Sequence, residues 1–210
     1  FLHDFAITPN WAVFLQNSIS FNPLPFVMGQ KGAAQCITSN PGGQSKFLLI
    51  PRDCGSFKGE RTRVFNAPHG FVFHHLNAWE EKEEVIVDSI HYEDFPSIGP
   101  NEDFRKINFD LIPEGRLTRC KINLLSKAIN SNELSDQCCE FAMVNPYLQG
   151  LSARYSWMAI AEKSKGNGPL QAIKKLNLIN GEECFWSAAP RGFVSEPMFV
   201  PNENSEIEDE

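Results

Sequence analysis

The chain has 210 residues, of which 42% are hydrophobic and 21% are charged, a composition typical of a folded globular protein. Its formal net charge is −7, and acidic residues gather at its end, over residues 202–210. Because this balance offers no basic surface to a phosphate backbone, nucleic acid is not an expected partner.

The six cysteines show neither a CxxC pair nor a zinc-binding spacing, and the sequence shows no secretory signal, so we expect free thiols in a reducing compartment. No apolar run approaches the roughly 18 residues that span a bilayer, which leaves contact with a membrane surface open. The chain begins at Phe1 inside an apolar pattern and ends in a run of acids, so we expect it to be a piece of a longer protein.

Short apolar bursts that alternate with polar residues recur along the chain and predict β-strands. The first two, residues 1–8 and 10–16, meet at Pro9-Asn10 and are expected to form a hairpin. The dipeptide Asn180-Gly181 is the strongest hairpin signal further along. The other expected strands are residues 46–52, 61–67, 71–79, 83–93, 116–124, 138–145, 154–162, 172–178, 184–189 and 196–201.

Only two segments resemble helices, residues 23–36 and 101–107, and Pro or Gly interrupts both. The expected class is therefore all-β. Strands at short intervals fit a sandwich, a barrel or a propeller, and no internal repeat distinguishes among the three.

Histidines are the first candidates for chemistry, and the chain has five of them: His3, His69, His74, His75 and His91. Any single histidine is more often an ordinary core or surface residue than a ligand. Successive side chains of a strand point to opposite faces, so His74 and His75 cannot both reach one site, and the pattern does not say which face is interior. Asp4, beside His3, is a candidate to orient a turn or a ring.

Two carboxylates stand among apolar residues, Glu140 in CCEFAMV and Glu196 in SEPMFV. A charge there is costly unless it is paired, and metal-binding histidines commonly donate their second N–H to a carboxylate. An exposed strand face explains the two residues equally well. No GxSxG element, glycine-rich phosphate loop or HExxH motif is present, and Cys138-Cys139 fits a buried strand better than a reactive pair.

Four motifs, in this order, resemble the carotenoid cleavage oxygenase family: LHDFAITPNWAVF, FHHLNAWEE, the glutamate of CEFAMVNP, and RGFVSEPMFVP. The resemblance covers nearly the whole chain. It implies a seven-bladed β-propeller with a non-haem Fe(II) on its axis, held by four histidines, three of which are oriented by glutamates. Residues 1–210 would then be an internal fragment of one such domain.

Carried over by motif, the resemblance makes His3 and His74 iron ligands and leaves His75 facing away as a packing or hydrogen-bonding residue. It gives Glu140 and Glu196 the role of orienting histidines. Two of the family's histidines and one glutamate have no counterpart, and His69 and His91 do not fit the missing motifs. The chain is thus expected to hold half of an iron site.

The implied activity is oxidative cleavage, by O₂, of a double bond in a carotenoid or apocarotenoid into two carbonyl products, with no organic cofactor. Phe5, Phe73 and Trp79 are candidates for the walls of a dry substrate tunnel, although core packing is the more common role for such residues. A stilbene-cleaving alkene dioxygenase, an inactive truncated remnant and a propeller that only binds partners are the alternatives, whereas retinoid isomerisation is disfavoured by the residues around the first motif. The expected location is a plastid for a plant protein and the cytoplasm otherwise, with any transit peptide preceding these residues.

Overall fold

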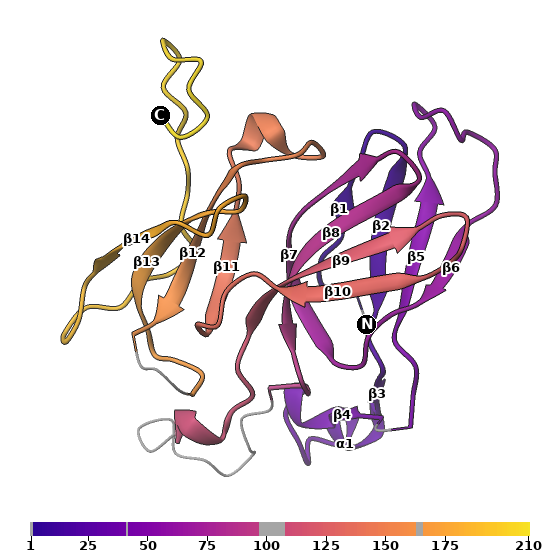
Figure 1. Ribbon diagram of the computed structural model, residues 1–210. Helices are drawn as coiled ribbons and strands as arrows, with labels where there is room; N and C mark the ends of the chain where they lie inside the picture. The colour runs from indigo at the N-terminus through magenta and orange to yellow at the C-terminus, as the bar shows by residue number, and fades with distance from the viewer. Residues whose placement is uncertain (1, 41, 97–107, 163–165) are drawn as a thin grey trace.

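Three antiparallel sheets of four strands each make up most of the computed structural model, which describes residues 2–40, 42–96, 108–162 and 166–210 (Figure 1). The first sheet has the order β1-β2-β5-β6, the second β10-β9-β8-β7 and the third β11-β12-β13-β14. Four-stranded antiparallel sheets that follow one another along the chain have the form of propeller blades.

The strands of the first sheet are β1 (Ala6–Ile7), β2 (Trp11–Gln16), β5 (Lys46–Pro51) and β6 (Arg63–Asn66). Those of the second are β7 (Phe71–Glu81), β8 (Glu84–Tyr92), β9 (Arg116–Asn123) and β10 (Ile129–Glu133). Those of the third are β11 (Cys139–Met143), β12 (Tyr155–Ala161), β13 (Leu170–Asn177) and β14 (Glu183–Ser187). Short 3₁₀ helices lie at Ala34–Cys36, Phe109–Leu111 and Pro146–Leu148.

The edge strands β1, β7 and β11 bring the three sheets together. Each is the first strand of its sheet in the chain and lies at one edge of it, and β7 contacts both β1 and β11. In Figure 1, β7 lies between the third sheet and the strands of the first. Residues on or next to these three strands therefore become neighbours although they are far apart in the sequence.

Two apolar cores lie on either side of the second sheet. One joins it to the first sheet and includes Trp11, Phe47 and Val85, while the other joins it to the third sheet and includes Leu117 and Met158. The alternating pattern of β2 places Trp11 and its alternate neighbours in the first of these cores. The second sheet is covered on both faces, so β8 is buried along most of its length.

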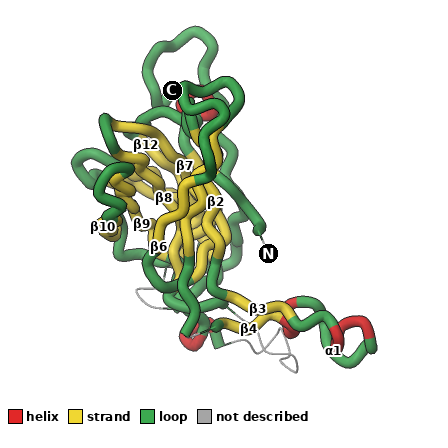
Figure 2. Tube along the Cα trace, turned by 90° about the vertical axis from the view of Figure 1, so that its right-hand side faces the viewer, coloured by secondary structure: helices red, strands yellow, loops and turns green. Residues whose placement is uncertain are grey.

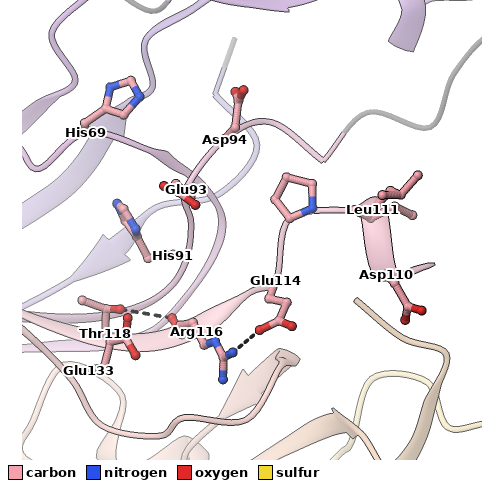
Figure 3. A pocket seen from close by; sticks show the side chains of 12 residues that line it. His69, His91, Glu93, Asp94, Asp110, Leu111, Glu114, Arg116, Thr118 and Glu133 are labelled. Carbon is pink, nitrogen blue, oxygen red and sulfur yellow. Dashed lines mark hydrogen bonds and ion pairs between the residues drawn. The ribbon is translucent and has the colours of Figure 1, made fainter. Parts of the chain in front are cut away.

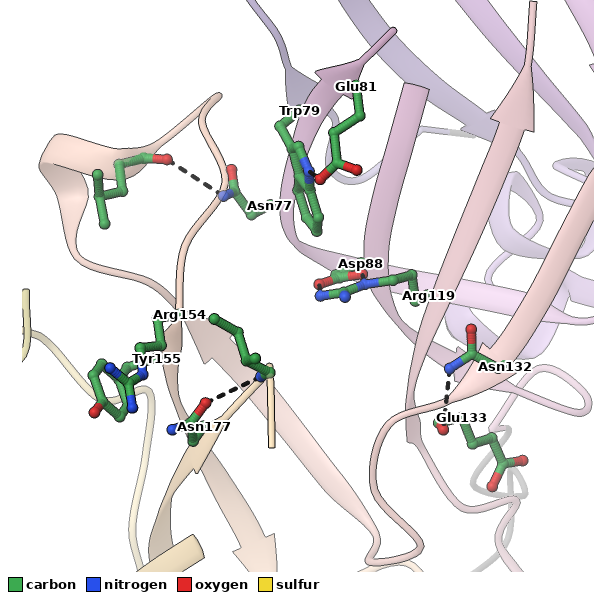
Figure 4. Close-up of polar contacts among 12 residues, drawn as sticks. Asn77, Trp79, Glu81, Asp88, Arg119, Asn132, Glu133, Arg154, Tyr155 and Asn177 are labelled. Carbon is green, nitrogen blue, oxygen red and sulfur yellow. Dashed lines mark hydrogen bonds and ion pairs between the residues drawn. The ribbon is translucent and has the colours of Figure 1, made fainter. Parts of the chain in front are cut away.

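A buried ion pair lies inside the second sheet (Figure 4). Asp88 on β8 is fully buried and accepts hydrogen bonds from Arg119 on β9 at 2.8 and 2.7 Å. The guanidinium lies over the ring of Trp79, 4.8 Å from its centroid. Trp79, which the sequence offered as a candidate wall of a substrate tunnel, is instead buried in the packing between strands. Burial raises the pKa of Asp88, and the bonds from Arg119 oppose that shift.

Most of the expected strands are present, including the hairpin of β1 and β2 and the turn at Asn180-Gly181 between β13 and β14. The strand expected at 196–201 is wrong: the segment belongs to none of the sheets, and Pro197 and Pro201 lack the N–H that a ladder needs. Three strands were not expected, β3 (Ile19–Phe21), β4 (Ile37–Ser39) and the polar, exposed β10. The candidate helix at 101–107 lies outside the described residues.

An arm formed by residues 19–39 projects from the sheets (Figure 2). Its base is the two-stranded sheet of β3 and β4, and its tip holds the single-turn helix α1 (Leu24–Val27). Of the helix considered for 23–36, only this turn and the 3₁₀ turn at Ala34–Cys36 form. In the part of the chain that the structure describes, no helix is long and apolar enough to span a bilayer. All six cysteines are free, and Cys138 and Cys139 are buried, as expected.

Candidate metal centre

Two histidines that are far apart in the sequence meet where β1 and β7 contact each other. His3 precedes β1 and His74 lies on β7, and their Nε2 atoms are 3.1 Å apart. The ring centroids are 5.0 Å apart, with the ring planes inclined at 71°. The two residues that the family motifs single out, 71 positions apart, are thus brought together by the packing of β1 against β7.

A bulge in β7 decides how its side chains point. The pairing with β8 shifts between Val72 and His75 and again between His75 and Asn77, so simple alternation fails there. Phe73 and His74, although adjacent, line the same cavity. His75 points elsewhere, with its Nδ1 2.7 Å from Oγ of Ser89, in agreement with the hydrogen-bonding role expected for it.

Glu140 on β11 binds the ring nitrogen of His74 that points away from His3. Its Oε2 lies 2.6 Å from Nδ1 of His74, so Nε2 of that ring is turned toward His3. The same carboxylate accepts the hydroxyl of Tyr92 at 2.7 Å and the backbone N–H of Phe141 at 2.7 Å. Glu140 is 8% exposed, so these donors replace the water that a carboxylate would otherwise bind.

The charges around His74 favour its protonated form in the absence of a metal. The hydrogen bond to Glu140 raises the pKa of His74, burial opposes this, and the charges of Glu140, Asp4 and Glu196 add smaller increases. Burial raises the pKa of Tyr92, which therefore stays a hydroxyl donor to Glu140. Burial lowers the pKa of His75 to about 4, so that ring is neutral at physiological pH.

Phe141, which follows Glu140, has a left-handed backbone with φ of 55°. This conformation is strained for a residue with a side chain, and it coincides with a shift in the pairing of β11 with β12 after Glu140. The ring of Phe141 packs on His74, with centroids 5.2 Å apart. Sequence reasoning did not find Phe141 or Tyr92, because neither residue type by itself signals a metal centre.

An apolar cavity of about 370 Å³ opens beside the histidine pair. Its walls include Phe73, Phe109, Ile112 and Phe141, and Phe73 also packs against the apolar core. Phe5 instead stacks on Phe14, 5.0 Å between centroids, outside the lining of this cavity. The site therefore joins two imidazole rings to an apolar space large enough for part of a hydrocarbon chain.

Glu196 lies in an extended segment after β14, is exposed, and contributes to the site through its charge, as one of the smaller effects that raise the pKa of His74. His69 and His91 line a different cavity, of about 890 Å³, with Glu93, Arg116 and other polar residues (Figure 3). They lie apart from the His3–His74 pair, as the motif comparison implies.

The histidine pair fits a shared metal ion. Two imidazole nitrogens bound to one ion at about 2.1 Å, at about a right angle to each other, lie about 3 Å apart. The observed 3.1 Å matches this spacing and also suits an N–H···N hydrogen bond. A carboxylate on the far nitrogen of a ligand histidine, as on His74, is the usual outer-sphere arrangement. Among the described residues, no cluster of three or more metal-ligating side chains occurs.

Comparisons with known proteins place the chain among carotenoid oxygenases. The chain is 42% identical to apocarotenoid-15,15'-oxygenase of Synechocystis over all 210 residues, which span 42% of that protein, and 27% identical to a carotenoid 9,10(9',10')-cleavage dioxygenase of Crocus sativus over 96% of the chain and 38% of the relative. The chain thus spans less than half the length of these relatives.

The crystal structure of cobalt-substituted Synechocystis ACO matches the fold with a TM-score of 0.92 and 42% identity, over 100% of this chain and 43% of that one. This likeness confirms the all-β class and the expected β-propeller architecture, while the total of seven blades stays a prediction. Residues 1–210 match the family described as retinal pigment epithelial membrane protein, RPE65. The chain therefore belongs to the RPE65 family of carotenoid cleavage oxygenases.

Proposed function

We propose that the intact protein is a non-haem Fe(II) dioxygenase that cleaves a conjugated double bond of a carotenoid or apocarotenoid into two carbonyl products. The observation that carries this proposal is the His3–His74 pair, backed by Glu140 and opening on an apolar cavity. The names of the Synechocystis and Crocus relatives support the reaction class. We further propose that residues 1–210 form an internal part of one seven-bladed propeller domain.

His3 and His74 would supply two of the nitrogen ligands, and other parts of the intact protein would supply the rest. Glu140 would keep the His74 ring in the orientation that presents Nε2 to the ion, and we propose a similar orienting role for Glu196 toward a histidine outside these residues. Bound Fe(II) supplies the activation of O₂, both atoms of which enter the two carbonyl products. Neutral histidine ligands leave the charge of the ion uncompensated, unlike a site that includes a carboxylate.

The cavity would select and hold the substrate. Aromatic and aliphatic walls bind a polyene by removing its apolar surface from water, at about 25 cal/mol per Å² buried. Phe73 and Phe141 flank His74 directly, so they would place a double bond next to the ion and exclude water from it. The chain's own part in the reaction is thus to hold two ligands and to position an apolar chain.

The test is a cleavage assay on the intact protein with ¹⁸O₂ and three substrate classes: a carotenoid, an apocarotenal and a stilbene. We expect aldehyde products from one of the first two, with label in both carbonyl groups. His74→Ala should abolish cleavage, whereas His69→Ala, which removes an exposed histidine, should not. Cleavage of the stilbene alone would assign the alkene substrate class instead, and activity retained by His74→Ala would refute the proposal.

We also propose that the arm of residues 19–39 contacts a membrane surface, where apolar substrates gather. Apolar side chains at its tip are well exposed, with Leu24 62%, Val27 77% and Met28 62% accessible, on a projection away from the sheets (Figure 2). Exposed apolar clusters of this kind commonly mark interaction sites.

For a plant source we propose a plastid location and otherwise the cytoplasm, which a fluorescent fusion of the complete gene product would test.

Flotation with phosphatidylcholine vesicles tests the membrane contact. Each side chain that enters the bilayer stabilises binding by about 1.5–3 kcal/mol, so changing Leu24 and Val27 to Ser should reduce binding at least tenfold. The matched control changes Leu125 and Ile179, which are 73% and 76% exposed elsewhere on the surface, to Ser. Equal binding by the two double variants would refute a role for the arm.

A further inference from the structure

Asp4 links the two segments that carry the histidine pair. Its Oδ1 accepts the backbone N–H of Phe5 at 2.8 Å, and its Oδ2 accepts the backbone N–H of His75 at 2.7 Å. Asp4 follows His3, and His75 follows His74. One carboxylate therefore binds backbone N–H groups two residues after His3 and one residue after His74.

The N–H of His75 needs such a partner because of its place in the sheet. His75 pairs with Ser89 of β8, but β7 is the edge strand of its sheet, so N–H groups that point away from β8 have no strand to bind. The bulge around His75 fixes which of these groups faces β1. The carboxylate of Asp4 replaces the missing strand at this single position, next to His74.

Other contacts hold β7 against the first sheet independently of Asp4. Near the far end of β7, Glu80 accepts hydrogen bonds from the side chains of Thr8 and Asn10 at 2.5 and 2.7 Å. The apolar core between the two sheets adds to this attachment. Loss of the Asp4 contact is therefore expected to leave the sheets packed while loosening the segments that carry the histidines.

We propose that Asp4 is a positioning residue that sets the separation between Nε2 of His3 and Nε2 of His74. Its effect on metal binding rests on the proposed function, but its effect on the spacing does not. Without Asp4, the hydrogen bond that joins the segment before β1 to the bulge of β7 would be lost. The two nitrogens would then no longer be held at the 3.1 Å that suits a shared ion.

The test compares Asp4→Ala with the wild type in the intact protein, by crystal structures of the metal-free forms and by Co(II) titration followed by visible absorption. We expect a wider Nε2–Nε2 separation, a changed Co(II) spectrum, and Co(II) affinity about 10- to 100-fold weaker, as for other outer-sphere partners. Asp4→Asn keeps one acceptor oxygen, which can bind the N–H of His75 but not also that of Phe5, so it should lie between the wild type and Asp4→Ala in all three measurements.

The matched control is Asp94→Ala. Asp94 likewise accepts the N–H of the next residue, Phe95, at 2.7 Å and binds a second segment through Ser39, but it lies apart from the histidine pair. We expect its spacing, spectrum and affinity to equal those of the wild type. If Asp4→Ala does not fold, Asp4→Glu replaces it, because the longer side chain keeps the charge and displaces the oxygen atoms.

An Asp4→Ala protein that is merely less stable, with the 3.1 Å spacing and the Co(II) spectrum of the wild type, would overturn the positioning role. An Asp4→Asn protein as impaired as Asp4→Ala would also overturn it, because the hydrogen bond to His75 would then not be what sets the spacing. A wild-type protein that binds no Co(II) would refute the proposed function. The metal-free spacing would still decide the role of Asp4.

Discussion

Changing Glu140 to Gln removes a charge behind His74 and leaves the shape of the site. In the wild type the carboxylate lies 2.6 Å from Nδ1 of His74. A hydrogen bond to a charged group contributes about 1.5–3 kcal/mol and a neutral one about 0.5–1.5 kcal/mol. The loss of about 1–1.5 kcal/mol predicts that the neutral His74 ring binds the metal roughly tenfold more weakly. Tyr92 can turn its hydroxyl to accept from the new amide, so the fold should survive.

Changing Glu140 to Gln should also lower the pKa of His74. Glu140 is the main reason that this pKa is raised, so it should fall toward the ordinary value of 6.5 in the Gln variant. Only the neutral ring binds metal, so the lower pKa should offset part of the weaker affinity at acidic pH. Histidine ring NMR of the metal-free protein gives the pKa, and Co(II) competition at pH 8 gives the affinity. Glu83→Gln, on an exposed turn, is the control. An unchanged pKa together with unchanged affinity would refute the role of Glu140.

Three further predictions concern stability. Because the pKa of His75 is lowered to about 4, below its unfolded value, the free energy of unfolding should fall as the pH drops from about 6.5 toward 4, by about 2 kcal/mol at pH 5. In urea titrations, His75→Gln should flatten the dependence of this free energy on pH. A dependence equal to that of the wild type would contradict the prediction. Asp88→Ala leaves Arg119 without its buried partner and should lower the free energy of unfolding, measured in urea, by about 3–5 kcal/mol. The control Asp136→Ala, at an exposed position, should lower it by about 0.5 kcal/mol or less. Similar losses in the two variants would argue against a buried ion pair. Because Phe141 has φ of 55°, Phe141→Gly should be more stable than Phe141→Ala by about 1 kcal/mol in thermal melts, the reverse of the usual order in strands. An Ala variant as stable as the Gly variant, or more stable, would contradict the strained backbone.

Alternation of apolar residues was sufficient to predict most of the sheets. It worked where one face of a strand is buried, as in β2, and failed in two kinds of place. The polar β10 has no apolar face to reveal it, since four of its residues are exposed. Residues 196–201 alternate but include two prolines, and an extended segment without a partner strand looks the same in sequence as a true strand.

The site was predictable only through the resemblance to a family. Periodicity could not bring His3 and His74 together across 71 positions, because that contact depends on how one sheet packs on the next. The bulge that places Phe73 and His74 in one cavity breaks the alternation on which sequence reasoning relied. Asp4 was noted as a residue that could orient a turn or a ring, and it instead binds backbone N–H groups near both histidines.

The metal content of the intact protein tests the central claim most directly. The protein, produced with Fe(II) and measured by elemental analysis, is predicted to hold about one iron per chain, as expected for a mononuclear oxygenase site. His3→Ala and His74→Ala should each lose the iron, while His69→Ala should keep it, because His69 lines a separate cavity. Iron retained in full by His74→Ala would contradict the account, since the ion would then be bound somewhere other than the histidine pair.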